Sequence, residues 1–372
     1  MPQYKFVYLD DKDLPSIEPL AEALERELEG ERESLKVKPE NPRPEFGQQL
    51  KALSEERIDG LILDLRLDET PGTFGQANYR GLALAQEIRT RATEDKAYAF
   101  PLLLVSSQLN LTKSFSSDRT GHDVVDRYYI KEKVADDSEQ MAREMVALVK
   151  GYSSIRRIAD TDFHWDRLLG ITAKTTDYLH SRMFEEFESL AVRPPAHEIS
   201  QFILKQLIDT SGPLIDDATA LARLGIAPDS PATDILLDRL TTFCGYNGFF
   251  SSATKRWWAK GIERFWLQKS KSKVPLRAVK AEDRVQILKK ALRLPELLAS
   301  PPIDKGYSTN YWTICRGYKR PLDPIDGVLM ASAEPKPWQE PSYLSRKAAK
   351  LRVGRELGLK PKEIEVFRTT SG

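Results

Sequence analysis

Residues 59–67 read DGLILDLRL, and this stretch decides the fold of the first part of the chain. Its apolar run is interrupted by one acid, Asp64, and is bounded by charged or small residues. A short continuous apolar run is typical of a strand that is buried on both faces, as in a parallel sheet. The residue at the carboxyl end of such a strand lies where open sheets bind their ligands. Asp64 is therefore the first candidate site residue.

Short apolar runs alternate with longer amphipathic runs throughout residues 1–150. The expected strands are residues 5–9, 34–37, 60–63, 102–106 and 127–130. The expected helices are residues 16–29, 46–56, 81–93 and 137–150, together with a less regular stretch over 109–125. Five strands that alternate with five helices predict an α/β fold, a flavodoxin-like (βα)5 domain over residues 1–150.

Polar residues follow four of the five expected strands. Asp10 and Asp11 end the segment FVYLDD, Ser106 follows PLLLV, and Lys131 ends DRYYIK. Transfer of a phosphoryl group to a carboxylate needs a nucleophilic Asp, a divalent cation and donors for the phosphoryl oxygens. Together with Asp64, these strand ends supply each part. A lone Asp after a strand is usually a cap or turn residue, but the combination is hard to obtain by chance.

The combination resembles the receiver domain of bacterial response regulators, in order and in strand context, over about 40% of the chain. The resemblance implies that Asp64 is phosphorylated by a histidine kinase. It also implies a Mg²⁺ cofactor held by Asp10, Asp11, Asp64 and the backbone carbonyl of Arg66, with Asp10 acting mainly through water, because Mg²⁺ prefers oxygen ligands and keeps several waters.

Three further roles follow from the resemblance. Ser106 and Lys131 are expected to bind the phosphoryl group, and Gly81 to open the third helix. Tyr128, three residues before Lys131, stands where the family has its switch aromatic. An aromatic residue on a strand of an α/β domain equally fits a core position, so both readings of Tyr128 stay open.

Two features depart from the family pattern. Residues 68–80 are longer than the usual loop beside the phosphorylation site, which suggests restricted access for a kinase or phosphatase. Glu132 replaces the usual proline after Lys131, which suggests a trans peptide bond where the family commonly has a cis proline.

Charge is distributed unevenly along the chain. Residues 1–150 carry 21 Lys and Arg against 29 Asp and Glu, a net charge of −8, residues 151–250 carry −5, and residues 251–372 carry +14. We expect a helical domain over 151–250 and a basic, helical and Pro-rich domain over 251–372. The expected helices after residue 151 are 167–190, 198–210, 232–243, 255–269, 281–299 and 345–357.

Two stretches of the basic region permit a nucleic-acid interpretation. Residues 256–273 interleave aromatic and basic residues, as a base-stacking surface does, and residues 345–367 resemble a helix-turn-helix. However, Trp258, Ile262, Phe265 and Trp266 recur at helical spacing, which favours a core stripe. We therefore favour protein docking over nucleic-acid binding for the basic region.

The whole sequence predicts a two-component response regulator whose phosphorylation at Asp64 switches a C-terminal protein-interaction or self-association region. Two alternatives stay open: a phosphate-buffer receiver without its own output, and a phosphorylation-regulated nucleic-acid binder. No Gly-rich phosphate loop or GxSxG motif occurs, so we expect no enzymatic output besides Mg²⁺-dependent phosphorylation and dephosphorylation of the receiver. The sequence has no secretory signal or run of about 18 apolar residues, so we expect a cytoplasmic protein that does not bind membranes.

Overall fold

The structure is a computed structural model that describes residues 2–108, 124–159, 164–172, 175–189, 194–271, 273–330, 335–351 and 359. The chain forms two compact units. The first unit comprises Met1–Leu168, Leu190–Leu204 and Phe249–Thr254, and the second comprises Leu169–Ser189, Lys205–Gly248 and Lys255–Gly372. The expected ranges 1–150, 151–250 and 251–372 therefore do not coincide with these units.

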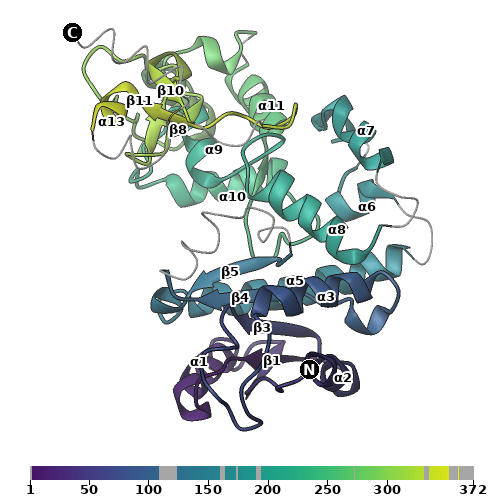
Figure 1. Cartoon of the computed structure of the whole chain (residues 1–372). Coiled ribbons are helices and arrows are strands. Elements are labelled where there is room, and N and C mark those ends of the chain that lie inside the picture. The colour runs from purple at the N-terminus through teal and green to yellow at the C-terminus, as the bar shows by residue number, and fades with distance from the viewer. Residues whose placement is uncertain are drawn as a thin grey trace. The chain divides into compact units, whose positions relative to one another are not determined.

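The first unit contains a five-stranded parallel sheet in the order β2-β1-β3-β4-β5 (Figure 1). This is the strand order of a flavodoxin-like sheet, and it confirms the predicted α/β fold of this part of the chain. All five predicted strands are present, the last two with the predicted bounds. They are β1 (Gln3–Leu9), β2 (Ser34–Glu40), β3 (Gly60–Asp64), β4 (Leu102–Ser106) and β5 (Arg127–Ile130).

Three helices connect these strands in the predicted places, and a fourth follows the last strand. The connecting helices are α1 (Leu14–Arg26), α2 (Phe46–Glu56) and α3 (Gly81–Ala92), and the last one is α5 (Ser138–Ala159). Leucines of α2 and α3 join one hydrophobic cluster with the alternate, fully buried residues of β1, β3 and β4, and α1 packs against α5. The stretch expected as a less regular helix over 109–125 falls mainly on 109–123, which lie outside the described residues.

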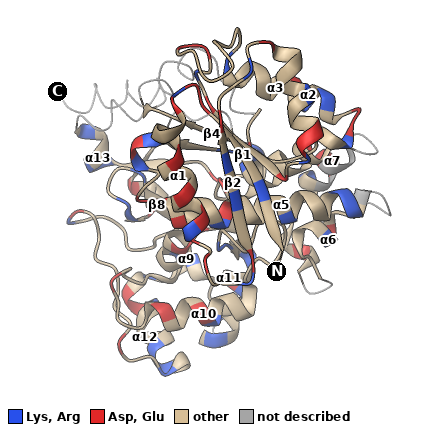
Figure 2. Ribbon diagram, turned by 90° about the horizontal axis from the view of Figure 1, so that it is seen from below, with Lys and Arg blue, Asp and Glu red and all other residues tan. Residues whose placement is uncertain are grey.

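Strand β2 forms one edge of the sheet. It runs through Pro39 to Glu40, three residues further than expected, because an edge strand tolerates a proline that a central strand does not. Basic residues mark this strand in blue in Figure 2. Lys36 and Lys38 pair with acidic side chains of α1 and α2, at 3.1 and 2.7 Å. Charged side chains of this kind protect an exposed edge from pairing with another chain.

The first unit extends beyond residue 150 because a buried carboxylate binds residues from later in the chain. Asp126, directly before β5, is fully buried and accepts hydrogen bonds from Arg89 of α3 at 2.7 Å and from Tyr152 of α5 at 2.8 Å. Ser200 of α8 (Ala196–Gln201) also donates to it, at 3.0 Å. A buried carboxylate without such partners costs several kcal/mol, so this helix belongs to the first unit.

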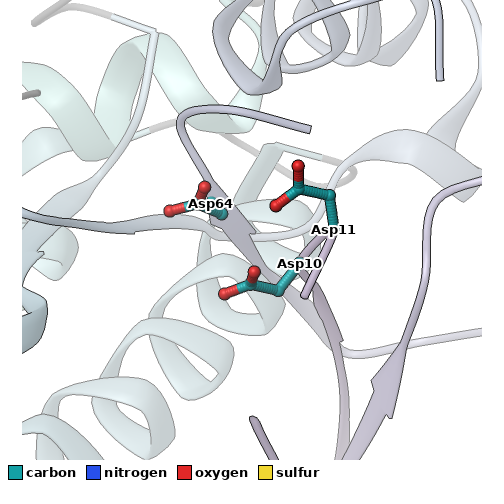
Figure 3. A group of neighbouring side chains, drawn as sticks. All are labelled: Asp10, Asp11 and Asp64. Carbon is teal, nitrogen blue, oxygen red and sulfur yellow. The ribbon is translucent and has the colours of Figure 1, made fainter. Parts of the chain in front are cut away.

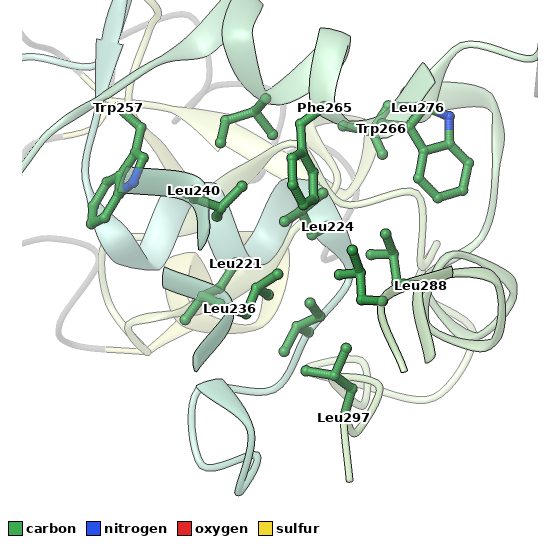
Figure 4. Close-up of a cluster of buried hydrophobic side chains, with 14 of the residues drawn as sticks. Leu221, Leu224, Leu236, Leu240, Trp257, Phe265, Trp266, Leu276, Leu288 and Leu297 are labelled. Atoms are coloured by element: carbon green, nitrogen blue, oxygen red, sulfur yellow. The ribbon is translucent and has the colours of Figure 1, made fainter. Parts of the chain in front are cut away.

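The second unit is built around one hydrophobic cluster that contains residues from 215 to 297 (Figure 4). Residues before and after position 250 contribute to this cluster, so they belong to one unit and not to two successive domains. The predicted core stripe is confirmed, since Trp258, Ile262, Phe265 and Trp266 are at most 2% exposed. These rings offer no stacking surface. The main helices are α9 (Asp217–Leu224), α10 (Thr233–Cys244), α11 (Ala259–Ser270) and α12 (Ala281–Leu292).

The second unit also contains a small sheet, so the expectation of a mainly helical region after residue 151 is corrected to a mixed one. Its strand order is β10-β11-β8-β9. Strands of three residues are too short to show an alternating pattern, which is why the sequence did not predict them. They are β8 (Thr313–Cys315), β9 (Arg320–Leu322), β10 (Gly327–Leu329) and β11 (Tyr343–Ser345). A separate pair joins β6 (Leu214–Ile215) to β7 (Trp257–Trp258).

The predicted helix over 167–190 is wrong. Helix α6 (Trp165–Leu169) ends at Gly170, whose φ of +62° lies in the left-handed region, and a Cβ there would lie 2.8 Å from the Asn247 backbone. A 3₁₀ turn, η4 (Thr176–Tyr178), and then α7 (Ser181–Ser189) follow.

The other predicted helices need smaller corrections. The helix expected over 281–299 ends at Leu292, because Arg293 is left-handed and Pro295 follows. The helix expected over 198–210 is α8 followed by a π-helical stretch, η5 (Phe202–Ile208). Of the helix expected over 345–357, α13 (Arg346–Lys350) is present and residues 352–358 lie outside the described part. Among the described residues, no helix combines the length and the apolar composition needed to cross a bilayer.

Candidate functional site

Three carboxylates converge where β1 and β3 end side by side (Figure 3). Asp10 and Asp11 follow β1, and Asp64 is the last residue of β3. Their exposed fractions are only 0%, 4% and 5%, and one oxygen from each lies within 4.8 Å of the others. After β1 the chain continues to β2 on one side, and after β3 it continues to β4 on the other side. Open α/β sheets bind ligands at such a point, where the direction of the connections changes.

Lys131 places its ammonium group among these acids. It follows β5 and donates to Asp10 Oδ2 at 2.6 Å, and its Nζ lies 2.9 Å from Asp64 Oδ1. Burial lowers the pKa of Lys131, but Asp64 and Asp10 outweigh burial and raise the pKa above its usual value. Lys131 therefore remains charged and partly neutralises the cluster.

Backbone groups of Arg66 and Gly81 lie close to Asp64 and fix its position. The Arg66 amide donates to its Oδ2 at 3.0 Å. Burial raises the pKa of Asp64 to about 6, opposed by the nearby Lys131 charge. Gly81 opens α3 against this residue, and a Cβ at Gly81 would lie 2.0 Å from the Asp64 carbonyl oxygen. Only glycine permits this close approach.

Asp11 is fixed by the loop after β3. Its Oδ2 accepts hydrogen bonds from the backbone amides of Glu69 at 2.9 Å and Thr70 at 2.6 Å. Burial raises the pKa of Asp11 above its usual value, and the two amides oppose this effect. Thr70 and Glu69 belong to the long 68–80 loop, so this loop contacts the acid cluster directly.

Ser106 and Tyr128 lie on neighbouring strands. Ser106, the last residue of β4, is fully buried, and within the described part of the chain its Oγ has no hydrogen-bond partner. Tyr128 of β5 is 46% exposed, so it is not a core residue. The Lys131–Glu132 bond is trans, as Glu132 in place of proline suggested. The Glu132 side chain accepts a hydrogen bond from the Gln108 amide at 3.2 Å.

The donor set fits a Mg²⁺ ion. Three buried carboxylates supply hard oxygen donors, which this ion prefers. Their mutual repulsion, only partly relieved by Lys131, favours a further positive charge at the same place. Ligation by the Arg66 carbonyl stays a prediction.

Two residues at this site were missed by the sequence argument. Tyr8 donates its hydroxyl to Asp10 Oδ2 at 2.7 Å, and burial together with Asp10 raises the pKa of Tyr8. Asn41 follows β2 and donates to the Asp10 carbonyl at 3.0 Å. Tyr8 could have been found from the alternation along a strand, since residues 8 and 10 share a face.

Without a divalent cation, the first unit should lose stability as pH rises from about 4 to about 6. The folded pKa of Asp64, about 6, exceeds its ordinary value of 3.8, so in this window the folded state keeps a proton that the unfolded state has released. The loss is at most roughly 3 kcal/mol. Urea titrations of the parent and Asp64→Asn in a chelator measure it. The stability gained by Asp64→Asn should grow across this window, and a gain independent of pH would contradict the shift.

No family model and no curated protein matches the chain. Among solved structures, a sensor protein from Polaromonas sp. JS666 gives a TM-score of 0.29 at 13% identity, over 40% of this chain and 98% of that chain. The Legionella pneumophila response regulator LqsR gives a TM-score of 0.27 at 14% identity, over 65% of this chain and 75% of that chain. The Francisella novicida lysine decarboxylase LdcF gives a TM-score of 0.23 at 14% identity, over 61% of this chain and 32% of that chain. Because these TM-scores are low, the interpretation of the site rests on its geometry.

Proposed function

We propose that the first unit is a phosphate-accepting receiver, in which Asp64 takes a phosphoryl group in a Mg²⁺-dependent reaction. One observation carries this proposal. The carboxylates of Asp10, Asp11 and Asp64 meet the ammonium group of Lys131 in a buried cluster at the carboxyl ends of parallel strands. Nucleophile, cation ligands and a fixed positive charge are the groups that phosphoryl transfer to a carboxylate requires.

In the proposed reaction, an oxygen of the Asp64 carboxylate attacks the phosphorus atom of a phosphohistidine donor. A bond from that oxygen to phosphorus forms, and the bond from phosphorus to the donor's imidazole nitrogen breaks as the imidazole leaves with the electron pair. Asp10, Asp11 and Asp64 would hold Mg²⁺, which neutralises the phosphoryl oxygens when bound. Lys131 and the Arg66 amide hold the carboxylate in place. The acyl phosphate is later hydrolysed, when water takes the phosphoryl group as inorganic phosphate and the Asp64 carboxylate is regenerated. We propose no other chemistry.

Phosphorylation would give the side chains of Ser106 and Lys131 new acceptors, the phosphoryl oxygens. Ser106 Oγ is a buried donor with no partner among the described residues, and Lys131 already contacts the acceptor carboxylate. Each would bind phosphoryl oxygens only in the phosphorylated state. Such differential contacts are what allows a modification to shift a conformational equilibrium. Ser106 pairs with Ile130 of β5, so the change would reach the strand that carries the half-exposed Tyr128, our candidate switch aromatic.

Hydrogen exchange of the full chain tests this switch. Beryllofluoride with Mg²⁺ mimics the acyl phosphate and should slow exchange of the amides in β4 and β5. Ser106→Ala should keep the fold and lose most of this slowing, because the hydroxyl supplies one of the differential contacts. Ser54→Ala is the same change on α2, where the only hydrogen bond of the hydroxyl to a described residue goes to the Lys51 carbonyl. It should respond as the parent does. A full response in Ser106→Ala would show that the switch does not operate through this residue.

For partners, we propose a histidine kinase as the phosphodonor, on the resemblance of the first segment. We further propose that the region after residue 151 binds a protein partner or a second copy of the chain. Burial of the aromatic rings from Trp257 to Trp266 removes them from any base-stacking role, and this supports a protein over a nucleic acid.

A further inference from the structure

Asn41 uses its whole side-chain amide to join two parts of the site. It follows β2 and is 3% exposed. Its Nδ2 donates to the carbonyl oxygens of Asp10 at 3.0 Å and Lys12 at 2.6 Å. Its Oδ1 accepts from the amide of Thr73 at 3.0 Å and from the Thr73 hydroxyl at 2.8 Å. An amide offers two donors and two acceptor lone pairs, so no bonding position of Asn41 is left over.

The 68–80 loop forms a tight turn that contacts the Asn41 side chain. Gly72 and Gly75 exchange two backbone hydrogen bonds of 3.0 Å each, which close a tight turn around Thr73. Gly75 has a φ of +107°, a conformation that residues with a side chain rarely adopt. A Cβ at Gly72 would lie 2.6 Å from the Asn41 Cβ. The turn is therefore a defined structure whose glycines permit close contact with this one side chain.

The start of the same loop holds one oxygen of Asp11. The amides of Glu69 and Thr70 both donate to Asp11 Oδ2, and these two bonds occupy the two lone pairs of that atom. Oδ1 is thereby left as the oxygen available to a cation. One oxygen of the Asp11 carboxylate is turned toward Asp64 (Figure 3). A single oxygen from each carboxylate suits Mg²⁺, which fills its octahedral shell with water.

We propose that Asn41 is a positioning residue for the cation site, acting through the 68–80 loop to hold Asp11 with one oxygen directed at the ion. The proposal rests on the proposed function, in that the ion is Mg²⁺ bound by the acid cluster. Asn41 fixes the turn at Thr73, the turn fixes the amides of residues 69 and 70, and these amides fix Asp11. Partners that orient a metal ligand in this way typically change metal affinity by 10-fold to 100-fold.

Titration of the full chain with MgCl₂ by calorimetry tests the proposal. Asn41→Ala should bind Mg²⁺ about 10-fold to 100-fold more weakly than the parent. Thr73→Val removes only the hydroxyl bond to Asn41 and keeps the side-chain shape, so it should weaken binding by about threefold to tenfold. Asn78→Ala is the matched control, since the Asn78 side chain is exposed in the same loop and makes none of these contacts. Its affinity should equal that of the parent.

A double-mutant cycle distinguishes positioning from general support of the fold. If Asn41 acts through Asp11, then Asn41→Ala should weaken Mg²⁺ binding in the parent but hardly at all in an Asp11→Asn background. Equal effects in the two backgrounds, or parent-like affinity in folded Asn41→Ala, would overturn the proposal. If Asn41→Ala does not fold, parent-like affinity in Thr73→Val overturns it instead. Failure of the parent to bind Mg²⁺ would be a different result, since it would refute the proposed function.

Discussion

Asp64→Asn is expected to reduce phosphorylation by a small phosphodonor to background. The amide that replaces the carboxylate is not a nucleophile at neutral pH, and its loss of charge also removes one anionic ligand of the cation. Labelled phosphodonor, Mg²⁺ and the full chain are incubated together, and the acid-stable and base-labile label is counted. We expect this to be the largest effect, because the proposal assigns Asp10 and Asp11, the other two carboxylates of the cluster, to the cation.

Asp59→Asn is the matched control for this experiment. Asp59 precedes the same strand at its other end, where its carboxylate accepts a hydrogen bond from the Lys5 amide, so its label should equal that of the parent. Asp11→Asn should still accept label but need more Mg²⁺, since it keeps the nucleophile and loses a cation ligand. Label that persists in Asp64→Asn would mean that another group accepts the phosphoryl.

Lys131→Ala is expected to separate cation binding from switching. The ammonium group contacts both Asp10 and Asp64, where it competes with Mg²⁺, so its removal should leave Mg²⁺ affinity equal to or higher than that of the parent. The exchange protection by beryllofluoride over β4 and β5 should nevertheless be lost, because the charge that we propose binds the phosphoryl oxygens is gone. Without a divalent cation the variant should be less stable by about 3 kcal/mol, since two buried carboxylates lose their partner.

The control for Lys131→Ala is Lys133→Ala, the same change at an exposed position two residues further on. It should keep the stability, Mg²⁺ affinity and beryllofluoride response of the parent. A Lys131→Ala variant with the full beryllofluoride response would show that the lysine only balances charge in the unphosphorylated state.

The sequence predicted that these side chains come together because they stand at strand ends. In a parallel sheet the carboxyl ends of all strands lie at the same end of the sheet. The position of a residue such as Asp64 or Lys131 after an apolar run therefore predicts where it lies. Asn41 follows β2, the one strand of the five for which the sequence analysis named no residue at the carboxyl end. Pro39 made the second strand look as if it ended at residue 37, whereas the strand is at the edge of the sheet and continues through the proline to Glu40.

The second unit was less predictable because its structure depends on contacts between distant residues. The helical stripe of Trp258 to Trp266 was strong enough to identify core residues. By contrast, the three-residue strands β8 to β11 exist only through their pairing with one another. The break at Gly170 depends on the approach of the Asn247 backbone, which local sequence does not indicate.

Site mapping of the acyl phosphate in the unaltered chain tests the central claim most directly. The parent is phosphorylated with a small phosphodonor in Mg²⁺ and reduced with borohydride, which converts an aspartyl phosphate to homoserine, and the peptides are then sequenced by mass spectrometry. We expect homoserine at position 64, and we expect none there when a chelator replaces Mg²⁺. Homoserine at another acid, or at position 64 regardless of the chelator, would contradict the central claim.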